Sequence, residues 1–143
     1  MEVKQISVFL ENKIGRLAES TEILGDKKIN IRALAIADTA EFGILRMIVD
    51  KPQEAYQALE ERGFTVSQTQ VVVVEVEDKP GGLAQVMAIL GKAGINVEYL
   101  YAFVAPKGKN ALVVFKIEKL KNTVDLLQAQ KVKILSVEEI SRL

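Results

Sequence analysis

The sequence repeats itself, and this repeat constrains the fold more than any other feature. Shifted by 66 positions, residues 12–18 (NKIGRLA) align with residues 78–84 (DKPGGLA). The same shift aligns residues 29–31 (INI) with residues 95–97 (INV). Beyond residue 40 the shift becomes 68, with the two extra residues in the loop over residues 105–110. Self-similarity of this kind indicates one structural unit used twice.

Each half shows the hydrophobic pattern of a β-α-β-β-α-β unit. In the first half the pattern predicts strands over residues 5–10, 30–37, 44–50 and 64–69, and helices over residues 17–24 and 52–63. In the second half it predicts strands over residues 71–77, 96–104, 112–118 and 132–136, helices over residues 83–93 and 122–130, and one helical turn in the tail at 137–143. The predicted fold class is therefore α+β, with two ferredoxin-like domains over residues 1–69 and 70–143. No linker rich in Pro, Gly or Ser separates the halves, so we expect the domains to be held side by side.

A turn that leads into a helix carries the clearest chemical signal, and both halves contain it. In the second half this turn consists of Asp78, Lys79, Pro80, Gly81, Gly82 and Leu83. A helix N-terminus presents unpaired amide groups and a partial positive charge, and glycines let a ligand approach the backbone closely. We therefore expect the turn to hold a carboxylate. Asn96 heads the second strand, which we expect to begin near the turn, and its carboxamide suits the rest of a zwitterion.

On these residues the chain resembles a tandem pair of ACT domains, the small amino-acid-sensing modules of many metabolic enzymes. The resemblance covers residues 3–136, and it rests on residues 78–83 and 94–97 and on their copies at 12–17 and 29–31. It implies ferredoxin-like domains with antiparallel sheets side by side, helices on one face, and amino-acid binding where paired domains meet. The ligand-binding residues it implies are Asn12, Gly15, Arg16, Leu17, Asn30, Ile31, Asp78, Pro80, Gly81, Gly82, Leu83, Asn96 and Val97.

No catalytic domain accompanies the repeats, so the chain resembles the free-standing members of this family. That resemblance implies a regulatory protein that senses a free amino acid and acts on a metabolic enzyme or a transcription factor. The first copy departs from the second at two positions, where Ile14 replaces Pro80 and Arg16 replaces Gly82. The Arg16 side chain either crowds the turn or pairs its guanidinium with a ligand carboxylate. Either the first site is altered or only one site of the pair is competent.

The residues that are missing exclude much catalytic and metal chemistry. The chain has no Cys and no His, which removes thiol nucleophiles, disulfides, thiolate and imidazole metal sites, and Ser-His-Asp triads. Its 19 basic and 19 acidic residues give zero net charge, which argues against a nucleic-acid binder. The N-terminus has no signal-peptide pattern, and no apolar stretch is long enough to cross a bilayer. We therefore expect a cytoplasmic protein with no cofactor, metal, membrane or nucleic-acid partner.

Aromatic residues suggest an assembly of several copies. Tyr99, Tyr101 and Phe103 alternate along one face of a predicted strand whose other face is also apolar. A strand that is apolar on both faces needs cover on both. The helices can cover one face, and a second sheet from another copy is the simplest cover for the other, which predicts a homodimer or a larger homo-oligomer. The alternative is that the aromatic rings cap a sheet that faces solvent.

The sequence is compatible with three functions. The first is a module that binds a free amino acid, as the repeated turns and asparagines favour. The second is an assembly scaffold without a ligand, which the departures at Ile14 and Arg16 favour. The third is a small ferredoxin-like enzyme with Tyr99 or Tyr101 as acid or base, which needs a titratable group with a displaced pKa beside a pocket.

Overall fold

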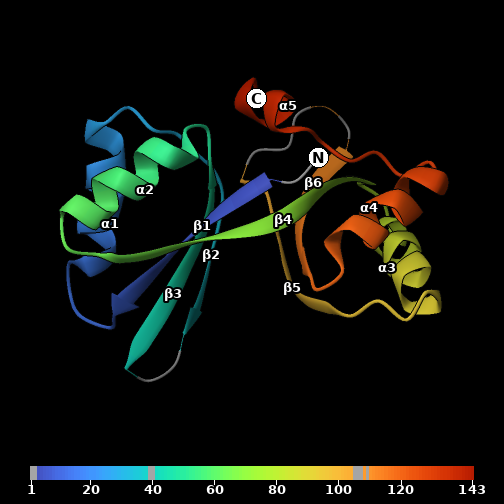
Figure 1. The fold of residues 1–143 in the computed structure, drawn as a ribbon, viewed down its shortest axis with the longest axis horizontal. Coiled ribbons are helices and arrows are strands. Elements are labelled where there is room, and N and C mark those ends of the chain that lie inside the picture. Colours follow the sequence, from blue (N-terminus) through green and yellow to red (C-terminus); the bar gives the residue numbers. More distant parts are fainter. Residues whose placement is uncertain (1–2, 39–40, 105–107, 109) are drawn as a thin grey trace. The chain divides into compact units, whose positions relative to one another are not determined.

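The computed structural model describes residues 3–38, 41–104, 108 and 110–143, and the chain divides into two compact units (Figure 1). We call Lys4–Thr69 the N-terminal unit, and Gln70–Leu143 together with Met1–Val3 the C-terminal unit. The loop in which the repeat gains two residues, 105–110, lies mostly outside the described residues, as does the start of the turn after residue 38.

The N-terminal unit is a sheet with two helices packed on one face (Figure 1). Its elements are β1 (Val3–Glu11), α1 (Arg16–Asp26), β2 (Ile31–Asp38), β3 (Phe42–Val49), α2 (Pro52–Glu61) and the first part of β4 (Thr65–Glu77). The strand order is β2-β3-β1-β4, and β3 pairs antiparallel with both β1 and β2. Alternate residues of β1 and β3 bury their side chains against Leu24 of α1 and Leu59 of α2, and this layer forms the core of the unit.

The C-terminal unit repeats this arrangement. Its elements are the rest of β4, α3 (Gly82–Lys92), β5 (Val97–Ala102), β6 (Asn110–Ile117), α4 (Leu120–Ala129) and α5 (Val137–Ser141). The strand order is β4-β6-β5, with β6 antiparallel to both neighbours. Leu90 of α3 and Leu127 of α4 pack on the valines of β4 and on Phe115 of β6. The prediction of α+β, ferredoxin-like units with helices on one face is confirmed.

Most element ends lie within two residues of the sequence prediction, and two differences are larger. The strands predicted over residues 64–69 and 71–77 form one continuous strand, β4, because no Gly or Pro interrupts this β-prone run. The strand predicted over residues 132–136 shrinks to a single bridge between Ile134 and Val74. The chain leaves the sheet there because the Ser136 side chain accepts a hydrogen bond from the Glu139 backbone N–H, which begins α5. The helical turn predicted in the tail is confirmed as α5.

The aromatic face of β5 does not need a second copy of the chain. Tyr101 and Phe103 are only 8% and 7% exposed in the single chain. Both interpretations of this face, a second sheet from another copy or a sheet that faces solvent, assumed that its rings were exposed. That assumption fails for these two rings, whereas Leu100 and Val104 on the other face of the run are 40% and 63% exposed, and the homo-oligomer stays a prediction.

Candidate functional site

The two turns predicted to bind a ligand have the same geometry. In the first, the Lys13 backbone N–H donates to the Glu11 carbonyl at 2.8 Å, and in the second the Lys79 N–H donates to the Glu77 carbonyl at 2.9 Å. Each turn also holds a Lys–Glu ion pair at 2.7 Å between these same residues. The hydrogen bond from Lys13 and its charge hold the pKa of Glu11 below its usual value, with a smaller contribution from the charge of Arg16. The two turns therefore share a backbone hydrogen bond and an ion pair as well as sequence.

A glycine begins each helix in a conformation that other residues rarely adopt. Gly15 and Gly81 have φ angles of 89° and 86°, and no side chain caps α1 or α3. Positive φ at a helix start favours glycine because it has no Cβ. A Cβ built on either glycine would find nothing within 4 Å, so both turns are open above the backbone. Open, uncapped helix starts fit the carboxylate cradle expected from the sequence.

A small hollow lies beside the first turn, within the N-terminal unit. Its volume is about 150 Å³, and its lining residues are Leu10, Glu11, Asn12, Lys13, Leu17, Ile36, Phe42 and Gly43. The hollow thus brings together two predicted site residues, Asn12 and Leu17, with apolar side chains from β2 and β3. Leu17, Ile36 and Phe42 are each about two-fifths exposed, and Ile14 in the turn itself is fully exposed. Exposed apolar side chains around a hollow are typical of a surface that another molecule covers.

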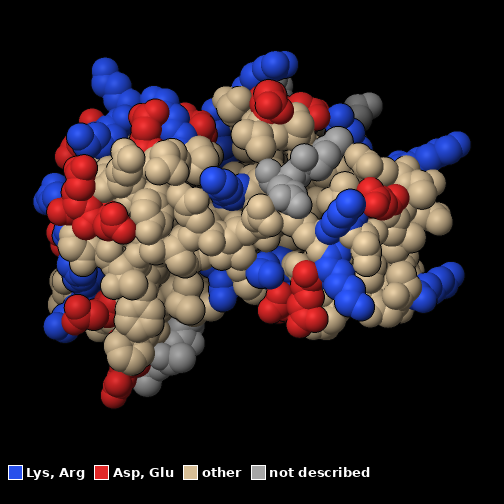
Figure 2. All heavy atoms as spheres, viewed as in Figure 1, with Lys and Arg blue, Asp and Glu red and all other residues tan. Residues whose placement is uncertain are grey.

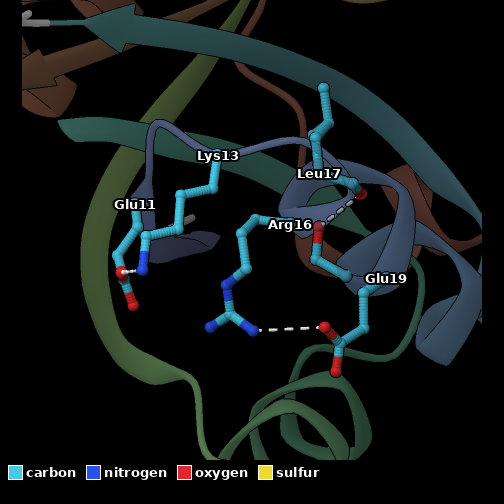
Figure 3. A network of polar contacts seen from close by, with 6 residues as sticks. Glu11, Lys13, Arg16, Leu17 and Glu19 are labelled. Atoms are coloured by element: carbon cyan, nitrogen blue, oxygen red, sulfur yellow. Dashed lines mark hydrogen bonds and ion pairs between the residues drawn. The ribbon is translucent and has the colours of Figure 1, made fainter. Parts of the chain in front are cut away.

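Arg16 points away from this hollow. Figure 3 shows the Arg16 and Leu17 side chains pointing in opposite directions, although the residues are adjacent. The Arg16 guanidinium lies 4.3 Å from the centre of the Phe64 ring and donates to the Glu19 carboxylate at 3.1 Å. The Arg16 side chain is thus engaged by its own unit and lines no part of the hollow, and its role toward a ligand stays a prediction.

The corresponding position in the C-terminal unit is Gly82, and it is buried against the chain itself. A Cβ at this position would overlap the backbone carbonyl oxygen of Glu77. Gly82 also lines a second, larger cavity of about 350 Å³. The other predicted residues of this turn, Asp78, Pro80, Gly81 and Leu83, are exposed and do not line that cavity.

The predicted asparagines lie far from the turns of their own units. In the C-terminal unit Glu77, which precedes the turn, pairs with Asn110, whereas Val97, which follows Asn96, pairs with Ile117. Asn110 and Ile117 are seven residues apart on β6, which separates Asn96 from the turn by about 24 Å at about 3.4 Å per residue. The expectation that the second strand begins near the turn is wrong, because α3 carries the chain back to the other end of the sheet.

The N-terminal unit separates the same two features. Leu10, next to the first turn, pairs with Gly43, and Ile31, next to Asn30, pairs with Val49 at the other end of β3. The Asn30 backbone N–H donates to the Asp50 carboxylate at 2.9 Å, and the Asp50 N–H donates back to the Asn30 carbonyl at 3.1 Å. Ile31 and Val97 pack on the cores of their units. A site that uses both a turn and an asparagine therefore needs two domains.

The described residues form no metal cluster, and the face drawn in Figure 2 carries no charged stripe. Among the described residues, no group of three or more acidic side chains is placed to hold a metal ion. No described helix combines the length and the hydropathy required to cross a membrane. Acidic and basic side chains are interspersed over the face shown in Figure 2.

The comparisons with known proteins agree with this architecture. A family model described as an ACT domain pair matches residues 1–143. A solved protein from Bacteroides thetaiotaomicron is 40% identical, with a TM-score of 0.94, and the match covers 100% of this chain and 98% of that one. No curated protein matches the chain.

More distant solved structures share the fold alone. The ligand-free regulatory subunit of aspartate kinase from Thermus thermophilus is 19% identical, with a TM-score of 0.63 and coverage of 88% of this chain and 91% of that one. The same subunit from Thermus flavus is 16% identical, with a TM-score of 0.62 and coverage of 90% of both chains.

The fold and the duplicated glycine turn define a class of protein, the tandem pairs of small ferredoxin-like modules. Within that class, this chain belongs to the family of ACT domain pairs, as the match over its whole length shows.

Proposed function

We propose that this ACT domain pair is a regulatory protein rather than an enzyme, and that it binds a free amino acid at the glycine turns. The hollow beside the first turn is the observation that carries this proposal. The backbone at the start of α1 suits an α-carboxylate, because helix N-termini attract anions. The Asn12 carboxamide can accept from an ammonium group, and Leu17 and Ile36 offer an apolar wall to the side chain.

A second copy of the chain would complete the site. The hollow of about 150 Å³ is smaller than the roughly 300 Å³ at which small-molecule pockets usually begin. Its exposed apolar rim and the distance between each turn and the asparagine of its own unit both support a site shared with another domain. We therefore propose a homodimer or larger homo-oligomer, with a metabolic enzyme or a transcription factor as the regulated partner. The cytoplasmic location expected from the sequence stays a prediction.

A ligand-free scaffold is the second candidate. The full exposure of Ile14 favours it, because an apolar turn can join two copies without any ligand. The two candidates differ in whether a small molecule changes stability and association.

A thermal-shift screen against the free amino acids tests the proposal. A ligand present well above its Kd stabilises the folded state, so at least one amino acid at about 10 mM should raise the Tm. The same amino acid should increase the fraction of dimer in sedimentation velocity. Flat melting curves for all of them would contradict amino-acid binding and favour the scaffold.

A matched pair of substitutions locates the site. Leu17→Asp adds a negative charge at the start of α1, which should repel a carboxylate ligand while leaving an exposed position folded. Leu83→Asp makes the same change at the corresponding, similarly exposed position of α3. Loss of the shift in Leu17→Asp and its retention in Leu83→Asp places binding at the first turn. The reverse result assigns it to the second turn, and an unchanged shift in both excludes the turns.

A further inference from the structure

The two units differ in structure at the corner where the first helix of each unit begins. In the N-terminal unit the corner where α1 begins is filled by the Arg16 side chain, which lies over Phe64 and pairs with Glu19. By the repeat, these residues correspond in turn to Gly82, Val132 and Gln85. All three counterparts line the cavity of about 350 Å³ in the C-terminal unit. The second unit therefore has an open cavity where the first holds its own guanidinium.

The cavity is large enough for a small molecule and is lined by both polar and apolar groups. Its volume falls at the lower end of the range of small-molecule pockets. The apolar lining residues are Val76, Val86, Ile89 and Val132. The polar and charged lining residues are Glu75, Glu77, Gln85, Asn110, Gln130, Lys131 and Lys133.

Two of the four charges in this lining are neutralised by the chain. Glu77 pairs with Lys79 at 2.7 Å, and Lys133 pairs with Glu139 at 3.0 Å. The half-buried Glu75 carboxylate accepts a hydrogen bond from the neutral Asn110 amide at 3.1 Å, and no described cation pairs with it. The Lys131 ammonium likewise has no ion pair among the described residues. Glu75 and Lys131 are thus the two lining charges without a described ion pair, Glu75 half-buried and Lys131 exposed.

We infer that this cavity is a binding site for a small molecule with a guanidinium group and a carboxylate, such as free arginine. The guanidinium pairs with Glu75, as the Arg16 guanidinium pairs with Glu19 in the other unit, and the carboxylate pairs with Lys131. Val132, which adjoins Lys131 in the lining, packs against the methylene groups between the two ends. The cavity is separate from the hollow at the first turn, but Gly82 of the second turn lines it, so variants at the two places have to distinguish the two proposals.

Isothermal titration of the whole protein with three probes tests this inference. L-Arginine should bind in the ratio of one per chain. L-Citrulline has the same shape without the positive charge, and agmatine lacks the carboxylate. Since hydrogen bonds to charged groups are stronger than neutral ones, each should bind at least about tenfold more weakly than arginine. No heat from arginine up to about 10 mM, or equal binding of citrulline, would overturn the inference.

Two variants test which lining residue binds each end of the ligand. Glu75→Gln keeps the size of the side chain and an oxygen for Asn110, and it should weaken arginine binding about tenfold. Lys131 has a φ of 62°, a conformation that asparagine tolerates, so Lys131→Asn should fold. That variant should weaken arginine but leave agmatine unchanged. Unaltered arginine affinity in Glu75→Gln, or equal weakening of both probes in Lys131→Asn, would overturn the assignment.

Control variants in the N-terminal unit separate this site from the first turn. Glu19→Gln changes the counterpart arrangement around Arg16 and should leave arginine binding unchanged. Leu17→Asp should also leave it unchanged, although it removes binding at the first turn. Arginine binding that is lost in Leu17→Asp and retained in Glu75→Gln would overturn the cavity site while the proposed function stands.

Discussion

Gly82 and Arg16 occupy the same position of the repeat and have opposite effects on their surroundings. Arg16 extends a long side chain over Phe64, whereas Gly82 has no side chain and lies against the Glu77 carbonyl. The backbone at Gly82 therefore lies closer to the Glu77 carbonyl than a residue with a Cβ would allow. The corner is filled in one unit and is part of a cavity in the other, and the residues differ at all three corresponding positions.

The close approach at Gly82 predicts a strong dependence of stability on this residue. Gly82→Ala should lower the free energy of unfolding by about 2 kcal/mol or more, because the new Cβ must push the Glu77 backbone away. Urea denaturation measures the change.

Gly91 in the same helix provides the control. Nothing lies within 4 Å of a Cβ built there, so Gly91→Ala should raise stability by about 0.5 kcal/mol through helix propensity. Equal effects of the two substitutions would show that the contact with Glu77 does not constrain the position.

At the scale of elements, α5 depends on a local capping box. The Ser136 side chain accepts from the Glu139 N–H, and the Glu139 carboxylate accepts from the Ser136 N–H, both at 3.2 Å. The hydrogen bond from Lys133, followed by that from the Ser136 backbone, holds the pKa of Glu139 below its usual value of 4.5. This short helix begins where the predicted final strand ends, so the cap decides which structure the chain adopts here.

Removing the cap should loosen α5. Ser136→Ala should cost about 1 kcal/mol, since it removes the side-chain acceptor of the Glu139 N–H at the start of this helix. Amide hydrogen exchange at Glu139 and Ile140 should accelerate accordingly. Ser136→Asp keeps an acceptor at the same place and should retain most of the protection. If the two variants exchange equally fast, capping does not hold α5.

The elements were predictable where residue pattern alone determines them. Alternating valines and the glycine turns located most strands and helices of both units. Asn30 and Asn96 were expected at the wrong end of the sheet, because the expectation left out that α1 and α3 carry the chain back before β2 and β5 begin. The contact between Arg16 and Phe64 joins residues 48 positions apart in sequence, and neither residue signals the other.

At the scale of the whole molecule, self-association should depend on the first turn. Ile14 is fully exposed, and the hollow beside it has an apolar rim. Sedimentation equilibrium of the wild-type protein should show a dimer or larger assembly. Ile14→Asp should weaken that association at least about tenfold, because burying an unpaired carboxylate is unfavourable.

Val137 offers a control for this prediction. It is an exposed apolar residue of the C-terminal unit, and Val137→Asp should leave the assembly unchanged. A wild-type protein that stays monomeric, or equal weakening by the two variants, would contradict an interface at the first turn.

The continuous strand β4 also limits how this chain can change over evolution. Its 13 residues serve both units, and the apolar positions Val72, Val74 and Val76 face the helices of the second. One residue inserted near Gln70 would reverse the face of every later side chain in the strand, exposing the valines and burying Glu75. The length of β4 where the two halves join is thus fixed. Related chains with the same duplication should tolerate insertions in their loops but none within this strand.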